Sequence, residues 1–503
     1  MRLGRLEARL KTVTTGDLAS LYAALNERDQ SVNTTAPAIV FVSAPPDGPA
    51  LDHAVLDHAA LDHAVLDRCS HFGIAAVEIT AAAPEPGAYL IGGALHGLRL
   101  PADEPDFSAT VVAVAERARL RQWAAACQDP EFTTTHKPGS DSRGVVQFRL
   151  GDEEIVAKIG DAAGLAGEVA FATKVNALLA GDGRPRLFPR VHGLLTEGEQ
   201  AVSLMEAGQP MPIAALFADE PRRTLASSAV TALTPHLEQL AAWYRLTAAD
   251  RPPTVADYLY RERYHALREL PAFTATFRAF FGDVPVADVL DVPVELAGGL
   301  VVPGWGEAVA WLDKVAPDLL PGQGSAVHGD IYAANMLLLP DGTPVLIDPR
   351  TVWEGRDRPD VGYGDPVFDL ATLLHGVFPM AAILHAVQSG DPAALFGGDP
   401  EAGQVRRGQD RLALSALTLP VGFPAAVTEL EAAMLAALPP ATEPAWRART
   451  RLYIGAATSL AGWLKYERSL AAPQAWLATA GYVAWYLWQA RNVWDNGNGK
   501  QAP

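Results

Sequence analysis

Three oxygen-bearing side chains in the second half of the chain have the types and the order that phosphoryl transfer requires. Asp330 and Asn335 lie in the segment HGDIYAANMLL (328–338), and Asp348 follows in VLIDPR. One carboxylate is needed to hold and deprotonate an attacking hydroxyl, and a second carboxylate and a neutral oxygen ligand are needed to hold Mg²⁺ against the phosphates. Because this chemistry consists mainly of alignment and charge neutralisation, the three groups must be held in fixed positions.

The sequence around these residues predicts how they are held. Two short apolar runs flank the turn Pro340-Asp341-Gly342, which is typical of a hairpin. Asp348 closes the second apolar run, so its carboxylate is expected at a strand end. The hairpin would then return Asp348 towards Asn335.

These motifs, together with YGDPVFDLATLLHG (363–376), resemble the aminoglycoside phosphotransferase and choline kinase superfamily, a branch of the protein-kinase-like fold. HGD or IDP alone is a weak signal, whereas the ordered set is specific. The resemblance implies that Asp330 is the catalytic base and that Asn335 and Asp348 are the metal ligands.

The same resemblance implies supporting roles for two further residues. His328 would support the catalytic loop, and Asp369 would anchor that loop from the start of a helix. Two departures from the protein-kinase pattern stand out. Pro349 follows Asp348 where protein kinases have Phe, which fits the small-molecule branch, and residues 351–363 form an insertion. The insertion would either fold over the substrate or form a surface loop.

The strand-rich region before these motifs offers candidates for nucleotide binding by the kinase template. Lys158 lies on a predicted strand, where a lysine that holds the α- and β-phosphates belongs. Glu168 lies in the following helix and would pair with it, although Glu153 and Glu154 are rivals. Taken singly, Lys158 would be an ordinary strand-end lysine and Glu168 a solvated helix position.

Two segments are candidates for the rest of the nucleotide site. KPGSDSRG (137–144) lies where a phosphate-covering loop belongs, and Gly139, Ser140 and Gly144 would let backbone N–H groups approach the phosphates. A plain hairpin turn explains this segment equally well. SLMEAGQP (203–210) resembles the hinge that hydrogen-bonds adenine through backbone groups near Glu206 and Ala207. A linker between lobes is the alternative, and both interpretations can hold.

Residue periodicity and the resemblance together predict an α+β protein. Its core is a protein-kinase-like bilobal fold with a small β-rich N-lobe and a mostly helical C-lobe, preceded by an α/β accessory domain. A hairpin around Gly151-Asp152, a helical stretch at 165–180 and strands within 191–206 indicate the N-lobe. The expected domains are an accessory domain at 1–105, the N-lobe at 106–208 and the C-lobe at 209–503.

The accessory segment contains the pentad repeat LDHAV, LDHAA, LDHAV, LDRCS (51–70), which carries His53, His58 and His63. Steps of five residues turn about 140° around a helix, so the imidazoles do not share a face. A zinc site needs converging ligands and is therefore not expected. A surface helix is the better interpretation, and the role of this segment stays open.

Composition restricts the class of protein. The chain has 503 residues, is 49% hydrophobic and carries a formal net charge of −18, with two cysteines, Cys69 and Cys127. This composition is globular, and so few cysteines argue against a disulfide-built secreted protein. The negative field disfavours nucleic acid and anionic membranes as partners. It favours a cationic substrate, although solubility alone explains it.

The sequence also favours a cytoplasmic protein. The N-terminus, MRLGRLEARLKTVTTGDL, has charges but no apolar core of a secretory signal. We expect no membrane span, because no uncharged apolar run reaches the roughly 18 residues that one needs.

Two features near the predicted catalytic motifs leave alternatives open. The aromatic tail would either line a sugar pocket by ring stacking or pack in the core; its members are Trp463, Trp476, Trp485, Trp488 and Trp494. Arg350 would contact phosphate or substrate, or form a salt bridge to a nearby carboxylate.

These observations predict a kinase that uses ATP or GTP with Mg²⁺ to phosphorylate a hydroxyl of a small molecule, such as an aminoglycoside, a sugar or an amino sugar. The alternative is a catalytically inactive kinase-like binding or scaffold protein. The presence of Lys158 together with Asp330, Asn335 and Asp348 argues against it, because a scaffold needs no complete Mg²⁺ set. A second activity in the accessory segment ranks lower, since that segment shows no phosphate-binding glycine motif.

Overall fold

The computed structural model describes most of the chain from residue 144 onward and four strands before it. The described residues are 39–43, 76–80, 87–91, 94–101, 144–150, 153–211, 225–350, 352–353, 356–357, 362–397, 405, 410–417, 423–439 and 443–498. They form two compact units. Unit 1 takes its described residues from within Met1–His136, Asp141–Ala166 and Val191–Ala207, and unit 2 takes the others.

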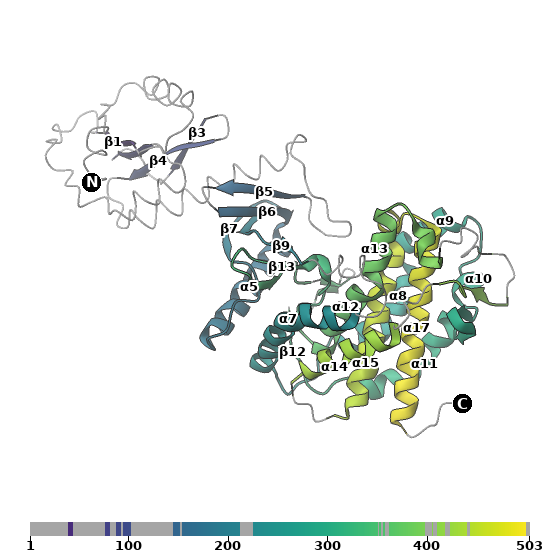
Figure 1. The fold of residues 1–503 in the computed structure, drawn as a ribbon. Coiled ribbons are helices and arrows are strands. Elements are labelled where there is room, and N and C mark those ends of the chain that lie inside the picture. The colour runs from purple at the N-terminus through teal and green to yellow at the C-terminus, as the bar shows by residue number, and fades with distance from the viewer. Residues whose placement is uncertain are drawn as a thin grey trace. The chain divides into compact units, whose positions relative to one another are not determined.

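Unit 1 contains an antiparallel sheet with the strand order β5-β6-β8-β7 (Figure 1). Its strands are β5 (Gly144–Leu150), β6 (Glu153–Asp161), β7 (Val191–Glu197) and β8 (Gln200–Glu206). Helix α5 (Ala162–Gly181) follows β6 directly. The hairpin, the helix and the strand-like stretch expected from the sequence are confirmed in order and type. The strand-like stretch forms the antiparallel strands β7 and β8.

A second sheet in unit 1 comes from the first part of the chain and has the order β1-β2-β4-β3. Its strands are β1 (Ile39–Ser43), β2 (Ala76–Thr80), β3 (Gly87–Ile91) and β4 (Ala94–Pro101). β1, β2 and β4 are parallel, and β3 runs antiparallel to β4. The histidine repeat lies outside the described residues, and an accessory domain stays a prediction.

Unit 2 is mostly helical, which confirms an α+β chain with its helices concentrated in the C-terminal part. Its helices after α5 are α7 (Leu225–Thr247), α8 (Arg263–Glu269), α9 (Pro271–Phe281), α10 (Ala287–Leu290), α11 (Trp305–Leu319), α12 (Pro366–His375), α13 (Ala381–Gln388), α14 (Phe423–Ala436), α15 (Ala445–Ala461), α16 (Glu467–Leu470) and α17 (Pro473–Gly497). Short π-helical segments occupy Tyr258–Glu262 and Gly376–Met380. Short 3₁₀-helical segments occupy Ala297–Gly299, Ala333–Asn335, Pro392–Phe396 and Gly462–Lys465.

Short strands connect these helices. They are β9 (Gln209–Pro210), β10 (Val294–Leu296), β11 (Leu300–Val302), β12 (Ser325–Ala326), β13 (Met336–Leu338), β14 (Pro344–Leu346), β15 (Val352–Trp353), β16 (Arg356–Asp357), β17 (Tyr363–Gly364) and β18 (Leu412–Ala413). β13 lies between β14 and β9 in an antiparallel sheet. This small sheet carries the hairpin that the sequence predicts around Pro340-Asp341-Gly342.

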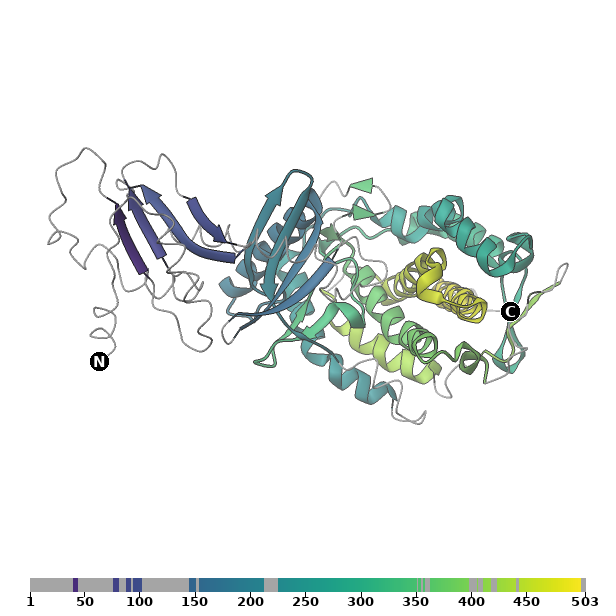
Figure 2. The ribbon, with the colours of Figure 1, turned by 90° about the horizontal axis from the view of Figure 1, so that it is seen from above.

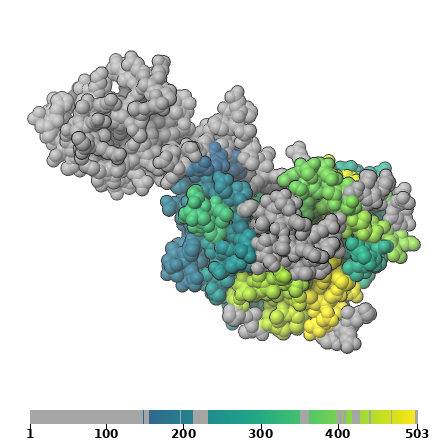
Figure 3. Space-filling view, viewed as in Figure 1, coloured from purple at the N-terminus to yellow at the C-terminus, as the bar shows by residue number. Residues whose placement is uncertain are grey.

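The core of unit 2 is built around α12, α15 and α17. The two C-terminal helices α15 and α17 pack against each other at its centre (Figure 2), and the end of α17 reaches the surface (yellow in Figure 3). Every residue of α12 is buried. Trp476, Trp485 and Trp494 of α17 are core residues, so packing rather than ligand contact explains these three rings.

One segment of the described chain, Pro366–Gln388, is long and apolar enough to cross a membrane, although the sequence predicted no membrane span. It comprises α12, a π-helical turn and α13, and 89% of its apolar 18-residue window is buried. Such burial is what the core helices of a globular domain show.

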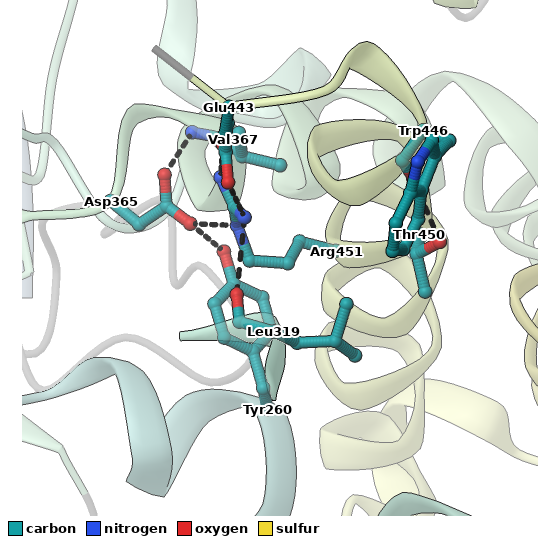
Figure 4. Close-up of polar contacts among 8 residues, drawn as sticks. All are labelled: Tyr260, Leu319, Asp365, Val367, Glu443, Trp446, Thr450 and Arg451. Atoms are coloured by element: carbon teal, nitrogen blue, oxygen red, sulfur yellow. Dashed lines mark hydrogen bonds and ion pairs between the residues drawn. The ribbon is translucent and has the colours of Figure 1, made fainter. Parts of the chain in front are cut away.

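A buried charge network joins the start of α12 to α15 (Figure 4). The Arg451 side chain donates from Nε to Oδ2 of Asp365 over 2.7 Å and from Nη1 to Oε2 of Glu443 over 2.8 Å. Tyr260 donates its hydroxyl to the same Asp365 oxygen over 2.7 Å, and the other Asp365 oxygen caps α12 by accepting from the N–H of Val367. The network therefore fixes where α12 begins.

Candidate active site

The β13–β14 hairpin places Asn335 and Asp348 side by side. Met336 pairs with Leu346 in the antiparallel register, and the N–H of Ile347 donates to the carbonyl oxygen of Asn335 over 3.0 Å. Asp348 comes directly after this last pair. Both predicted metal ligands thus lie at the same end of one hairpin, where its buried apolar strands hold them.

Asn335 also ties the hairpin to the loop that carries Asp330. Its Nδ2 donates to the carbonyl oxygen of Asp330 over 2.9 Å. Tyr332 lies within the electrostatic reach of both carboxylates: burial raises the pKa of its phenol, and the charges of Asp330 and Asp348 raise it further. The three residues that the sequence singles out are therefore neighbours in unit 2.

The backbone of the loop is held by a buried carboxylate on α12. Asp369 accepts hydrogen bonds from the N–H of His328 over 2.7 Å and from the N–H of Gly329 over 2.5 Å. Tyr244 donates its hydroxyl to the same carboxylate over 3.1 Å. Gly329 has a φ of 85°, a conformation that favours glycine. The loop therefore depends on α12 for its position, as the resemblance implies.

His328 connects the loop to the end of the hairpin. Its Nε2 lies 2.8 Å from the carbonyl oxygen of Ile347, and its carbonyl oxygen accepts from the N–H of Arg350 over 2.8 Å. Its ring stacks on Phe188, with 5.9 Å between the ring centroids. Because His328 is fully buried, it serves as a structural link between Asp330 and Asp348.

Asp348 has a strained backbone. Its φ is 59°, in the left-handed region that L-residues other than Asn and Asp rarely occupy. Such strain costs on the order of 1 kcal/mol and is often found at functional sites. The conformation turns the chain as it leaves β14, and the following residues bring Arg350 back to the loop.

Asp330 and Arg350 form an ion pair. Nη2 of Arg350 donates to Oδ2 of Asp330 over 3.1 Å, and both side chains are 28% exposed. The sequence left a salt bridge and a substrate contact open for Arg350, and the structure shows the salt bridge. This pair is located at the mouth of a pocket.

The pocket beside Asp330 is a hollow that is partly open to solvent and lies wholly within unit 2. We call it the Asp330 pocket; its wall includes Asp330, Arg350, Arg263, Ser459, Trp463 and Tyr466. Of the aromatic tail, Trp463 thus reaches this pocket, where it packs edge-on against Tyr466. No sequence pattern points to Arg263 and Ser459, because they come from helices far from the motifs.

Lys158, Glu206 and Ala207 belong to unit 1. Lys158 lies on β6 and points away from the face of Ala157 and Ile159, yet it is only 6% exposed. Burying an ammonium group at this level is costly unless a partner compensates for it.

The N–H of Ala207 donates to the carbonyl oxygen of Glu154 over 3.0 Å. The predicted adenine contact is therefore restricted to other backbone groups of this segment.

The remaining candidates are placed as follows. Glu168 lies on α5, half-buried, in the part of that helix that belongs to unit 2. Ser140 lies outside the described residues, so its predicted role at the phosphates stays a prediction. The same holds for most of the insertion at 351–363, of which only the short strands β15, β16 and β17 are described.

The oxygen ligands at the hairpin end suit magnesium. Mg²⁺ prefers hard oxygen donors and is usually held by one or two carboxylates together with phosphate oxygens and water. Asp348 and the amide oxygen of Asn335 are donors of this kind. Within the described ranges no three His, Cys, Asp or Glu side chains gather as a metal site would require. A site that takes its other ligands from a nucleotide fits these residues.

The model of the phosphotransferase enzyme family matches residues 133–404, which include the hairpin, the loop and α12. A search of curated proteins returned no match.

Three solved structures are similar, all at low identity. An aminoglycoside-3'-phosphotransferase of type VIII is 23% identical over 50% of this chain and 81% of its own, with a TM-score of 0.28. A spectinomycin phosphotransferase in complex with ADP and spectinomycin is 8% identical over 71% of this chain and 92% of its own, with a TM-score of 0.37. A fructosamine-3-kinase from Haemophilus somnus, itself described as putative, is 12% identical over 69% of this chain and 92% of its own, with a TM-score of 0.34. Because the family model matches more than half of this chain, the chain belongs to the phosphotransferase enzyme family.

Proposed function

We propose that this phosphotransferase moves the γ-phosphoryl group of ATP or GTP to a hydroxyl of a small molecule bound in the Asp330 pocket. The observation that carries the proposal is the convergence of Asp330, Asn335 and Asp348 through one hairpin and one loop. A carboxylate beside a pocket, next to a pair of oxygen ligands, is the arrangement that this reaction needs.

In this proposal Asp330 orients the acceptor hydroxyl and takes its proton as the new phosphate ester forms. Asn335 and Asp348 hold Mg²⁺, which when bound neutralises charge on the phosphates. Asp369 and His328 do not touch the reactants; they keep the loop in place. Lys158 binds the α- and β-phosphates, Glu168 orients Lys158, and backbone groups near Glu206 and Ser140 contact the rest of the nucleotide.

The ion pair with Arg350 has a consequence for Asp330. A guanidinium at 3.1 Å fixes the rotamer of the carboxylate. We infer that the main task of Asp330 is to align the hydroxyl, with proton transfer occurring late, as a loose phosphoryl-transfer transition state allows.

The alternative is an inactive kinase-like protein that binds ligands without turnover. The strained Asp348 argues against it, because backbone strain of this kind clusters at functional sites.

The test is phosphate transfer from ATP and GTP to a panel of hydroxylated acceptors, with Asp330→Asn beside the wild type. We expect Asp330→Asn to melt within a few degrees of the wild type and to lose turnover by roughly three powers of ten. Asp313→Asn, an exposed carboxylate paired with His265, is the matched control and should keep full activity. Removal of divalent ions with EDTA should abolish transfer, and added Mg²⁺ should restore it. Undiminished turnover in Asp330→Asn would disprove the role given to this residue.

A further inference from the structure

The charge of the Asp330 pocket is opposite in sign to the charge of the chain. The chain as a whole carries −18, whereas the pocket wall contains two guanidinium groups, from Arg263 and Arg350, and one carboxylate, from Asp330. His375 also lines the pocket but is neutral near pH 7, because burial lowers its pKa to about 4. The pocket wall therefore has a net positive charge.

Arg263 is held at the wall by close packing. Its side chain is 5% exposed, and an added Cβ at Gly462 would come within 2.7 Å of its Nη2. Gly462 has helical angles (φ −56°, ψ −20°) that any residue can adopt. Its lack of a side chain thus matters for the space it gives to the guanidinium and not for the backbone. Glycine at this position permits Arg263 to reach the pocket.

A second observation indicates a polar ligand next to Arg263. Ser459, on α15 and one turn before Gly462, is 8% exposed and lines the same pocket. Its Oγ makes no hydrogen bond within the described part of the chain. A buried hydroxyl without a hydrogen-bond partner is energetically unfavourable. A hydroxyl donor beside two guanidinium groups is a set of groups that binds an oxyanion.

We propose that the acceptor of this phosphotransferase carries an anionic group, a carboxylate or a phosphate, which Arg263 and Ser459 bind while Trp463 packs against the carbon skeleton. The proposal rests on the phosphotransferase function above and names the class of its acceptor. It departs from the cationic acceptor that the net charge of the chain favours, because the local charge at the pocket outweighs distant surface charge at a binding site.

The anionic group takes no part in the bond changes. The acceptor hydroxyl oxygen forms the new bond to the γ-phosphorus, the bond from that phosphorus to the β-phosphate oxygen breaks, and the hydroxyl proton passes to Asp330. Arg263 holds the far end of the acceptor. Arg350 stays paired with Asp330 and adds a second positive charge near the anion.

The test compares acceptors that share a hexose skeleton and differ in charge. D-glucose is neutral, D-glucuronate carries a carboxylate, D-glucose 6-phosphate carries a phosphate, D-glucosamine is cationic, and kanamycin is polycationic. Transfer of labelled phosphate gives kcat/KM for each, and calorimetry gives binding of the same compounds without turnover. We expect an anionic member to exceed its neutral and cationic counterparts at least tenfold in both measurements. The carboxylate and phosphate arms show which oxyanion the pocket accepts.

Three variants connect the preference to named residues. Arg263→Gln should lower kcat/KM for the anionic acceptor about 10- to 100-fold, and Ser459→Ala about 3- to 10-fold, with smaller effects on D-glucose. Gly462→Ala keeps every charge and displaces only the Arg263 guanidinium, so it should reproduce the Arg263→Gln effect even if that variant folds poorly. Arg268→Gln, which removes an exposed guanidinium paired with Asp291 in the same helix α8, is the control and should change nothing.

The outcomes separate the two proposals. Preferred phosphorylation and binding of D-glucosamine or kanamycin would overturn the anionic acceptor and leave the phosphotransferase function standing. An anionic preference that survives both Arg263→Gln and Gly462→Ala would overturn the assigned contact. Failure of every compound to be phosphorylated, together with failure of every compound to bind, would reject the anionic acceptor and the proposed function alike.

Discussion

The carboxylate of Asp369 holds the backbone of His328, accepting its N–H over 2.7 Å from the first turn of α12. This contact joins a buried helix to the loop that carries the proposed catalytic residue. Asp369 has no exposed surface, so neither water nor a substrate can replace what it does. The position of Asp330 is thereby determined from the core of unit 2.

Replacing Asp369 with asparagine should therefore affect stability and activity together. The amide turns one acceptor into a donor that faces a backbone N–H, and a buried mismatch of this kind costs about 2–4 kcal/mol. We expect a lower urea midpoint and a large fall in kcat, with Asp330→Asn showing the fall in kcat alone. Equal stability of Asp369→Asn and the wild type would contradict this dependence.

The strained backbone of Asp348 should reverse the usual order of stability of alanine and glycine variants at this position. Glycine is normally less stable than alanine in ordered structure by about 0.5–1 kcal/mol, but at a positive φ alanine bears the strain and glycine does not. Asp348→Gly should be at least as stable as Asp348→Ala in chemical denaturation. Both should be inactive at any Mg²⁺ concentration, since the proposed ligand is gone. A more stable alanine variant would show that the strain is absent.

Removing one partner of the buried charge network at the start of α12 should lower the free energy of unfolding strongly. Arg451 is 2% exposed and is the shared partner of Asp365 and Glu443. Arg451→Met leaves both carboxylates without this partner, which typically costs about 3–5 kcal/mol. The surface arginine Arg491, paired with Glu307, provides the control, because exposed ion pairs contribute about 0–1 kcal/mol. Similar melting temperatures for Arg451→Met and Arg491→Met would be the contrary result.

A buried histidine should make the protein sensitive to acid. Burial lowers the pKa of His236 to about 4, below the value of about 6.5 expected in the unfolded chain. The unfolded state therefore binds the proton first as the pH falls, and stability is lost between about pH 6.5 and pH 4. The loss between pH 7.5 and pH 5 is about 2 kcal/mol from this group alone.

His236→Leu removes this titration and should flatten the dependence. The measurement is the free energy of unfolding of both proteins at pH 7.5 and pH 5. His375, whose pKa burial also lowers to about 4, titrates in both, so the difference between the two proteins reports His236. Parallel losses in wild type and variant would assign the acid sensitivity to other groups.

The sequence was most informative where function and local structure depend on neighbouring residues. The hairpin that carries Asn335 and Asp348 was predictable, because a Pro-Asp-Gly turn and two apolar runs specify it. Lys158 was correctly expected on a strand, because a hairpin pattern surrounds Gly151-Asp152. Glu168 was correctly expected in the following helix, because residues 165–180 have helical periodicity. Their roles at the nucleotide stay predictions.

The pocket wall could not be predicted in this way. Arg263 and Ser459 belong to helices that carry no motif, and they meet only because α8 and α15 pack together. The Arg451–Asp365 pair is of the same kind, since no pattern along the chain links the two residues. The net charge of the chain sums over its whole surface, so it could not predict which charged side chains line the pocket.

The scattered origin of the Asp330 pocket bears on how its specificity can change. Its wall is drawn from α8, the loop before β13, the segment after β14, α12, α15 and the turn that follows α15. Grafting any one of these pieces from a relative would transfer only a fraction of the recognition surface. A new acceptor preference in this lineage therefore has to arise through concerted replacement at several distant positions, and redesign should treat those positions as one combinatorial library.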